Sequence, residues 1–259
     1  SWPAFATTTV VTLIAFIATP ALIMTIVLTR SPRKTLLLRM PKPSALTMGV
    51  LLAFAIHPAG VALGEGVKAL YPVGTDMGEQ MRQMGSIIGQ APSLWSVLFV
   101  LAVMPAVCEE LAFRGFILSG LRHVGRKWTA ILISSVLFGA AHGVWQQSLT
   151  ATVLGLVIGY LAVQSSSLLP GLLFHAIYNG LSLALAWNLE AWSEQFASSE
   201  WLLRGSGESF AYSWPVVIAS LTLSAAILFW FRNLPYEASA EESLNDALVR
   251  GERLADETP

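Results

Sequence analysis

The sequence predicts an all-α protein, a polytopic bundle of about seven helices that cross a membrane. The first observation is composition: 54% of the 259 residues are hydrophobic and only 12% are charged, with a mean hydropathy of +0.63. Soluble domains carry about 25% charged residues, so this chain lacks the polar residues that a water-facing surface requires. The second observation is the length of the apolar stretches, and the third is where tryptophan and basic residues fall between them.

The same composition excludes several classes of protein. A soluble enzyme and a disordered chain both need more charge than this sequence carries. The formal net charge of -1 leaves no basic excess for binding nucleic acid. Because Cys108 is the single cysteine, no disulfide can form within the chain.

Each predicted span is an apolar stretch that approaches the roughly 20 residues needed to cross the hydrocarbon core. The seven stretches are Phe5–Leu28, Thr47–Leu63, Trp95–Leu118, Thr129–Val144, Ser148–Val163, Leu168–Trp187 and Trp214–Phe231. The fourth and fifth are short, which predicts that one of them is tilted, broken or partly buried in protein. Interfacial tryptophans support these boundaries, and they are Trp95, Trp128, Trp145, Trp187, Trp214 and Trp230.

Basic residues predict the orientation, because cytoplasmic loops are enriched in lysine and arginine. The basic loops all fall on one side of the predicted membrane, and they contain Arg30, Arg33, Lys34, Arg39, Lys42, Arg122, Arg126, Lys127 and Arg232. The opposite loops hold Lys68, Arg82 and Arg204 among many glutamates. We therefore expect an integral protein of the inner or cytoplasmic membrane, with the N-terminus outside and the C-terminus in the cytoplasm.

Two segments fall outside the spans. Met77, Met81, Met84 and Ile88 recur at helical spacing, which predicts either an amphipathic helix on the outer interface or a capping loop. The acidic tail from residue 235 to residue 259 is expected to be a solvated cytoplasmic helix or a disordered end. Since the chain begins with Ser1, it is compatible with a piece of a longer protein, such as the tail of a permease.

Ionisable residues inside a span are costly and indicate function by default. The third span contains Glu109, Glu110 and Arg114. Glu110 and Arg114 share a helix face at a spacing of four residues and can neutralise one another. Glu109 lies about 100° from Glu110 around the axis, so it must find a partner on another helix or stay available for chemistry.

Two further polar motifs lie in later spans. Phe138 and His142 share a face of the fourth span, and His175 and Asn179 share a face of the sixth. Each motif alone is compatible with a structural role. At about 1.5 Å per residue, Glu109, His142 and His175 lie about 14, 20 and 10 Å from the cytoplasmic ends of their spans. We therefore expect them to converge, with Glu109 as a base on water and the histidines and asparagine as proton carriers and oxyanion donors.

The ordered set resembles the CPBP family of intramembrane proteases, also called the type II CAAX prenyl protease or Abi family. The resemblance rests on a Glu-Glu-x-x-x-Arg, a Phe-x-x-x-His and a His-x-x-x-Asn motif over about residues 95 to 188. It implies a four-helix catalytic core that hydrolyses peptide bonds of a membrane-anchored protein or peptide. By the resemblance, Glu109 activates water with help from His142, His175 and Asn179 stabilise the oxyanion, and Glu110, Arg114 and Phe138 support them.

Metal dependence stays open at this level. Glu109, His142 and His175 form a candidate three-ligand zinc site, although the His-Glu-x-x-His zinc motif is absent. A metal-free glutamate mechanism fits equally well. Cys108 beside the glutamates invites a thiol mechanism, but buried membrane cysteines are usually inert.

The expected organisation has four parts. They are N-terminal helices and an outer segment at 1–94, the protease core at 95–188, an outer loop and last helix at 189–234, and the tail at 235–259. The alternatives to a protease are a transporter and an idle scaffold or immunity domain. A transporter predicts repeated halves, which are not evident here, and an idle scaffold predicts a replaced motif residue, whereas every motif residue is present.

Overall fold

A computed structural model shows a helical bundle and describes residues 1–122, 126–188, 203–204, 211–238 and 240–249. The first long rod joins α1 (Trp2–Thr12), the π-helical η1 (Leu13–Ala18) and α2 (Thr19–Leu28). The next long helix is α4 (Pro43–Leu70), preceded by the short α3 (Pro32–Thr35). The third rod joins α6 (Leu94–Leu98), η2 (Phe99–Val103), α7 (Met104–Glu110), η3 (Leu111–Leu118) and α8 (Ser119–Arg122).

The second half of the chain completes the bundle. Its helices are α9 (Lys127–Ala140), α10 (Trp145–Ser165), α11 (Leu169–Trp187) and α13 (Trp214–Phe231). A two-residue antiparallel ladder pairs β1 (Leu203–Arg204) with β2 (Ala211–Tyr212) just before α13. Most of the outer loop expected between α11 and α13 lies outside the described residues.

The predicted membrane spans are confirmed, with one shortened. Six helical stretches in the described part of the chain are long and apolar enough to cross a membrane, and they begin at Trp2, Pro43, Leu94, Trp145, Leu169 and Trp214. The fourth predicted span is the shorter apolar helix α9, which has only 14 residues and ends at Ala140 rather than Val144. A helix of that length covers about 21 Å, less than the hydrocarbon core.

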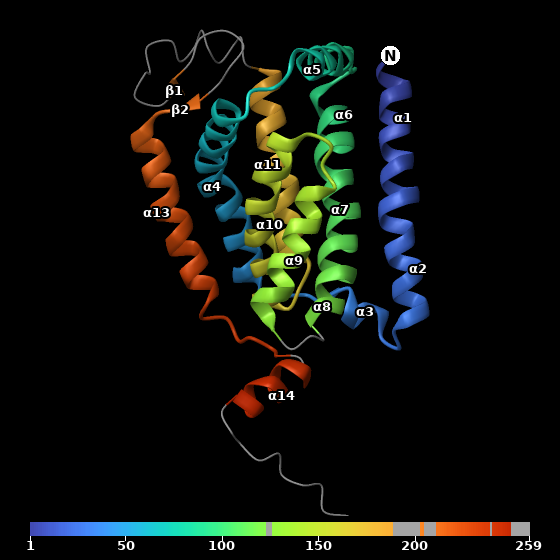
Figure 1. Ribbon diagram of the computed structural model, residues 1–259, viewed down its shortest axis with the longest axis vertical. Coiled ribbons are helices and arrows are strands. Elements are labelled where there is room, and N and C mark those ends of the chain that lie inside the picture. The colour runs from blue at the N-terminus through green and yellow to red at the C-terminus, as the bar shows by residue number, and fades with distance from the viewer. Residues whose placement is uncertain (123–125, 189–202, 205–210, 239, 250–259) are drawn as a thin grey trace, which may run out of the picture.

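The helices form a bundle with α4, α10 and α11 at its centre (Figure 1). α10 packs on α9, while α11 and α13 both pack on α4. The α1–α2 rod and α13 lie at opposite edges of the view, and α5 (Thr75–Ile88) lies across the end of the bundle that holds the N-terminus. The other end carries α3, α8 and the tail helix α14 (Ala240–Val249).

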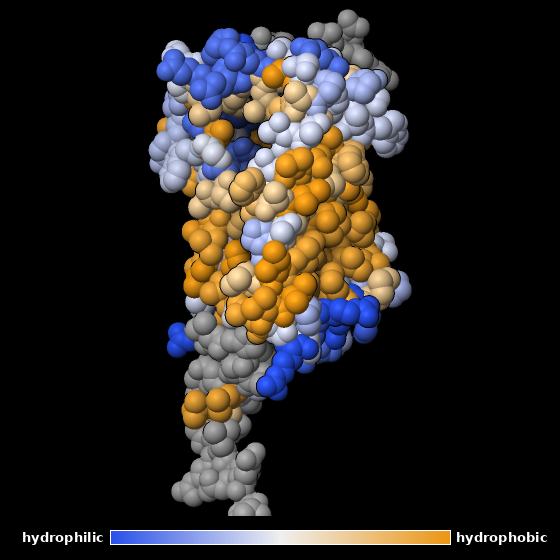
Figure 2. Space-filling model, turned by 90° about the vertical axis from the view of Figure 1, so that its right-hand side faces the viewer, coloured by the Kyte–Doolittle hydropathy of each residue, from blue (hydrophilic) through white to orange (hydrophobic). Residues whose placement is uncertain are grey.

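An apolar belt crosses the face of the bundle that Figure 2 shows, and hydrophilic residues gather at the two ends of the bundle. Large exposed side chains such as Phe16, Ile26 and Phe229 lie on the outside of the rods, with 74, 67 and 63% of their surface exposed. Exposed apolar area of this extent is stable only when lipid covers it. The chain is therefore an integral membrane protein.

Each of the two segments outside the spans contains a helix. α5 is an amphipathic helix, the first of the two alternatives for the methionine spacing. Ile88 packs against the cluster around Trp2, whereas Met81 and Met84 are about half exposed, at 47 and 50%. The tail contains α14, and its last ten residues, 250–259, lie outside the described part.

The centre of α4 is held by a side chain from α13. Pro58 removes one backbone donor from the middle of this helix. The hydroxyl of Ser220 donates to the carbonyl of Ala55 at 2.6 Å and accepts the amide hydrogen of Ala59 at 3.2 Å. It thereby inserts into the helical hydrogen-bond ladder beside the proline and joins α4 to α13.

Candidate active site

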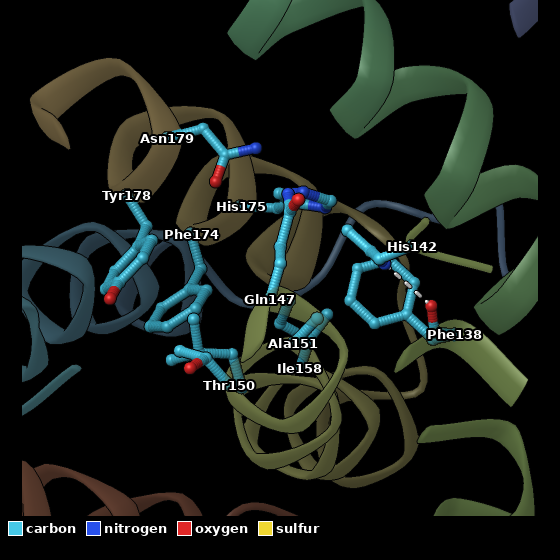
Figure 3. A pocket seen from close by; sticks show the side chains of 11 residues that line it. Phe138, His142, Gln147, Thr150, Ala151, Ile158, Phe174, His175, Tyr178 and Asn179 are labelled. Carbon is cyan, nitrogen blue, oxygen red and sulfur yellow. Dashed lines mark hydrogen bonds between the residues drawn. The ribbon is translucent and has the colours of Figure 1, made fainter. Parts of the chain in front are cut away.

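Two of the three sequence motifs line one cavity of about 150 Å³ between α9, α10 and α11. Figure 3 shows His142, His175 and Asn179 facing this space from two sides. The lining residues are Phe138, His142, Gln147, Thr150, Ala151, Leu154, Ile158, Phe174, His175, Tyr178 and Asn179. Glu109 is not part of this lining, and its Oε2 lies 3.8 Å from Nε2 of His175.

Glu110 and Arg114 form the ion pair that their spacing predicted. Arg114 Nη1 donates to Glu110 Oε1 at 2.9 Å, and both side chains are fully buried. Arg114 Nη2 also donates to the carbonyl of Gly155 on α10 at 3.2 Å. The pair therefore ties η3 to α10 as well as neutralising itself in low dielectric.

His175 lies between the two glutamates. Its Nδ1 is 2.9 Å from Glu110 Oε1, which can only accept a hydrogen bond while ionised, so Nδ1 carries the proton. Its Nε2 is 3.8 Å from Glu109 Oε2. Glu109 thus lies close to a side chain of another helix, and 18% of its own side chain remains exposed.

Phe138 is the point where all three motifs touch. The guanidinium of Arg114 lies 4.2 Å from the centre of the Phe138 ring. The rings of His142 and His175 stand edge-on to Phe138 at 5.0 and 5.7 Å. Cation–π and edge-to-face contacts of this kind are directional, so Phe138 fixes the relative placement of the three polar side chains.

His142 lies in the turn after α9, whereas the sequence analysis placed it inside a continuous helix. The helix closes with the amide of His142 donating to the carbonyl of Gly139 at 3.0 Å, and the exposed Gly143 follows. His142 Nδ1 lies 2.9 Å from the carbonyl of Phe138. A carbonyl accepts, so Nδ1 carries the proton and Nε2 has a free lone pair when the ring is neutral.

A three-ligand metal set is not assembled by these residues. In the part of the chain that the structure describes, no group of three or more His, Cys, Asp and Glu side chains is arranged to hold a metal ion. Glu109, His142 and His175, the candidate ligands of the sequence, are thus not gathered into such a group here. Cys108 is buried, with 2% of its surface exposed, and it does not line the cavity.

His57 is an ionisable residue within a span that the sequence analysis overlooked. It is 1% exposed on α4, and its Nε2 lies 3.0 Å from the hydroxyl of Ser182 on α11. Its Nδ1 lies 3.1 Å from the hydroxyl of Tyr212 in β2, and burial raises the pKa of Tyr212 to about 12, so that this phenol stays protonated. The rule that singled out the other histidines, an ionisable side chain in an apolar stretch, identifies His57 equally well.

Seven cavity residues outside the motifs also escaped sequence reasoning, among them two polar and two aromatic side chains. Gln147 and Thr150 come from the first turns of α10, and Phe174 and Tyr178 each precede a motif residue on α11. For Gln147 and Thr150 the sequence did carry a signal, because both are polar residues near the start of a span. Nothing in the spacing of the aromatic residues separates a cavity wall from ordinary core.

The comparisons with known proteins concern the same part of the chain. Residues 91–181 match the family described as type II CAAX prenyl endopeptidase Rce1-like. No curated protein and no solved structure matches the chain. The matched segment runs from just before α6 into α11 and contains every residue of the three motifs. Membership of this family implies an intramembrane protease. Residues 91–181 of this chain are therefore a domain of the Rce1-like type II CAAX prenyl endopeptidase family.

Proposed function

We propose that this chain is an intramembrane endopeptidase that hydrolyses a peptide bond of a membrane-associated protein or peptide with a water molecule activated by Glu109. One observation carries the proposal. The buried Arg114–Glu110 pair fixes Nδ1 of His175, and this leaves Nε2 of the same ring facing Glu109 beside the cavity.

Glu109 is the base in this scheme. Its carboxylate is partly exposed, whereas Glu110 is fully buried and already bound to Arg114 and His175. A water molecule held by Glu109 gives up a proton to the carboxylate while its oxygen attacks the carbonyl carbon of the substrate. The carbonyl π electrons move onto oxygen and form a tetrahedral oxyanion.

Asn179 and His175 stabilise that oxyanion. Both line the cavity from one face of α11, four residues apart. The amide of Asn179 donates directly, and Nε2 of His175 donates when the ring also carries a proton there, with the Glu110 carboxylate as its counter-charge. Donors held in place before the reaction are worth about 3 kcal/mol or more each in sites of this type.

His142 assists the proton transfers. Because its Nδ1 proton is bound to the carbonyl of Phe138, its Nε2 is free to accept a hydrogen bond from the attacking water. When the tetrahedral intermediate collapses, the bond between carbon and nitrogen breaks. The proton held by Glu109 then passes to the leaving amine, and the carboxylate returns to its starting state.

Substitution of Glu109 by glutamine tests the scheme. Glu109→Gln keeps the size of the side chain but removes the base, so we expect cleavage of a membrane-tethered peptide in liposomes to fall by at least about a hundredfold. Glu79→Gln, the same exchange in an exposed ion pair on α5, is the matched control and should cleave at the normal rate. Thermal unfolding in detergent checks that both variants are folded.

Retained cleavage would contradict the scheme. Full activity in folded Glu109→Gln would show that this carboxylate is not the base. Chelation by EDTA or phenanthroline with zinc add-back is a separate measurement, and it reports on metal dependence independently of the substitution.

A further inference from the structure

The end of the bundle that carries α3 and α8 holds a second space of about 150 Å³, which we call the basic pocket. It lies between the start of α4, the end of α10 and the segment that follows α13. Most of its lining comes from Arg39, Lys42, Gln164, Ser165, Leu234 and Pro235. Two cations line the basic pocket, and no carboxylate among the described residues does so.

The turn between α10 and α11 holds the backbone that carries Arg39. The hydroxyl of Ser167 donates to the carbonyl of Arg39 at 2.7 Å, and the amide of Leu168 donates to the carbonyl of Leu37 at 3.0 Å. Leu37 and Leu168 are 8 and 1% exposed. Arg39 is therefore placed at the basic pocket before any ligand arrives, and such preorganisation lowers the cost of binding.

The opposite side of the basic pocket is also fixed. Gln164 is 4% exposed, and its Oε1 accepts a hydrogen bond from Lys127 Nζ at 2.7 Å. Its Nε2 donates to the carbonyl of Leu234 at 3.1 Å. Lys127 thus adds a third positive charge within hydrogen-bond reach of a lining side chain, which raises the attraction for an anion.

The two lining cations are held by weak partners or by none. Arg39 Nη1 donates to Glu237 Oε2 at 2.7 Å, but these side chains are 47 and 64% exposed. Exposed ion pairs of this kind contribute little, so another anion can take the place of the glutamate. In the described part of the chain, the ammonium group of Lys42 has no hydrogen-bond or ion-pair partner. Both cations are therefore available to an external anion.

The basic pocket lies at the level where the apolar belt ends. α4 begins at Pro43, α10 ends at Ser165 and α13 ends at Phe231. Figure 2 shows hydrophilic residues directly below the belt at this end of the bundle. Met40 also lines the basic pocket and is 76% exposed, so an apolar side chain lies at its rim. An anion that carries hydrocarbon chains suits this position, and basic pockets between spans on the cytoplasmic side bind anionic headgroups.

The volume suits a phosphate group. A water molecule needs about 10–15 Å³ of such space, so the basic pocket has room for a phosphate together with water. Sites for larger ligands start at about 300 Å³, so the rest of a lipid would stay outside. The guanidinium of Arg39 can donate two parallel hydrogen bonds to phosphate oxygens, and Lys42 adds a compact positive charge.

We propose that the basic pocket binds the phosphate group of one anionic phospholipid from the adjoining leaflet. Arg39 and Lys42 contact the phosphate oxygens, and Glu237 competes with the lipid for Arg39. The lipid thereby joins the start of α4 to the segment that follows α13. This site is separate from the three motifs and does not depend on the proposed endopeptidase function.

The first test measures binding. The purified chain in detergent, at about 0.15 M salt to screen distant charges, is titrated with dioctanoyl phosphatidylglycerol or dioctanoyl phosphatidylcholine, and native mass spectrometry counts the bound lipids. We expect one phosphatidylglycerol per chain, with a Kd at least about tenfold below that of phosphatidylcholine. Both lipids carry a phosphate, but the choline cation cancels its charge, which weakens the attraction to basic residues.

Removal of the two cations should weaken this binding. Arg39→Gln/Lys42→Gln should raise the Kd for phosphatidylglycerol about twentyfold, because each cation near an anionic headgroup is worth roughly a factor of five. Arg33→Gln/Lys34→Gln is the matched control, since it removes the same charge from exposed residues at the same end that do not line the basic pocket. The control should change the Kd by less than about twofold.

Glu237→Gln makes the opposite change. It removes the competitor of Arg39, so we expect the Kd for phosphatidylglycerol to fall about two- to fivefold. Glu79→Gln, in an exposed ion pair at the other end of the bundle, should bind as the unmodified chain does. A gain in affinity does not arise from misfolding, so Glu237→Gln tests the site even if the double variant fails to fold.

Several results would overturn the proposal. Equal affinity for the two lipids would show that the charge of the headgroup is not recognised. Equal losses in the two double variants would mean that surface charge, rather than the basic pocket, attracts the lipid. An unchanged Kd in Glu237→Gln would contradict competition for Arg39. Displacement of phosphatidylglycerol by inorganic phosphate at the same concentration would indicate a site for a free anion instead of a lipid.

Discussion

Glu110 serves two partners with one carboxylate oxygen. Its Oε1 accepts from Arg114 on its own helix and lies 2.9 Å from Nδ1 of His175 on α11. The carboxylate therefore neutralises a buried cation and sets the position of a proposed catalytic ring at the same time. The i,i+4 ion pair was predictable from spacing, but the contact to His175 depends on how α11 packs and could not be read from the sequence.

Removal of this charge should cost stability. Glu110→Gln leaves the guanidinium of Arg114 fully buried without its counter-charge, so we expect a loss of about 3–5 kcal/mol in the free energy of unfolding. Reversible unfolding in detergent micelles measures it.

Glu65→Gln is the matched control for this exchange. The Glu65–Lys68 pair is half exposed, at 40 and 52%, and such pairs contribute about 1 kcal/mol or less. If Glu110→Gln lost no more free energy of unfolding than Glu65→Gln, the buried Glu110–Arg114 pair would not stabilise the structure around the site.

At the scale of helices, the apolar stretches and the tryptophans located most ends correctly. Trp145 and Trp214 are the first residues of α10 and α13, and Trp187 is the last of α11. The early end of α9 was not predictable, because hydropathy continues through Ala140 and Ala141 without a polar break. Only the local hydrogen bonds of the turn, including that of His142, show where the helix stops.

Two glycines four residues apart in α4 offer a direct test of helix packing. At Gly60 an added Cβ would collide with the phenol of Tyr178, whereas at Gly64 nothing lies within 4 Å. Gly60→Ala should therefore destabilise the protein by about 1–3 kcal/mol through overpacking. Gly64→Ala should be neutral or stabilise it by up to about 1 kcal/mol, because alanine favours the helix.

Thermal unfolding of the two variants separates overpacking from helix propensity, because both carry the same substitution in the same helix. Equal melting temperatures would mean that α4 does not approach α11 as closely as the structure shows. A lower melting temperature for Gly64→Ala than for Gly60→Ala would contradict the packing outright.

At the scale of the whole molecule, the sequence predicted that polar residues on separate spans would converge, but not how. Convergence requires Phe138 to contact Arg114, His142 and His175 together, and this depends on three helices packing at once. Periodicity reports which face of a helix a residue occupies, not which neighbour that face meets. The resemblance of the motifs to a protease family was the reason to expect that the three motifs belong to one site.

The end of the bundle toward which the cavity opens can be inferred from the α9–α10 turn. Gln146 Nε2 donates to the carbonyl of Tyr71 at 2.7 Å, and Tyr71 lies between α4 and α5. Gln147, the next residue, is exposed and lines the cavity. The mouth therefore lies toward α5, whereas α3, α8 and the basic residues beside them occupy the opposite end (Figure 1).

Because basic loops stay in the cytoplasm, we predict that the cavity opens on the outer side of the membrane. In a Cys108→Ala background, which has no other cysteine, Gln147→Cys should react with a membrane-impermeant maleimide added to intact cells. Thr75→Cys on the exposed face of α5 should react likewise, while Ser31→Cys should react only in inverted vesicles. Labelling of Gln147→Cys together with Ser31→Cys would place the mouth at the wrong end. If instead Ser31→Cys reacted in intact cells and Thr75→Cys reacted only in inverted vesicles, the orientation would be the reverse of the predicted one. The mouth of the cavity would still lie beside α5.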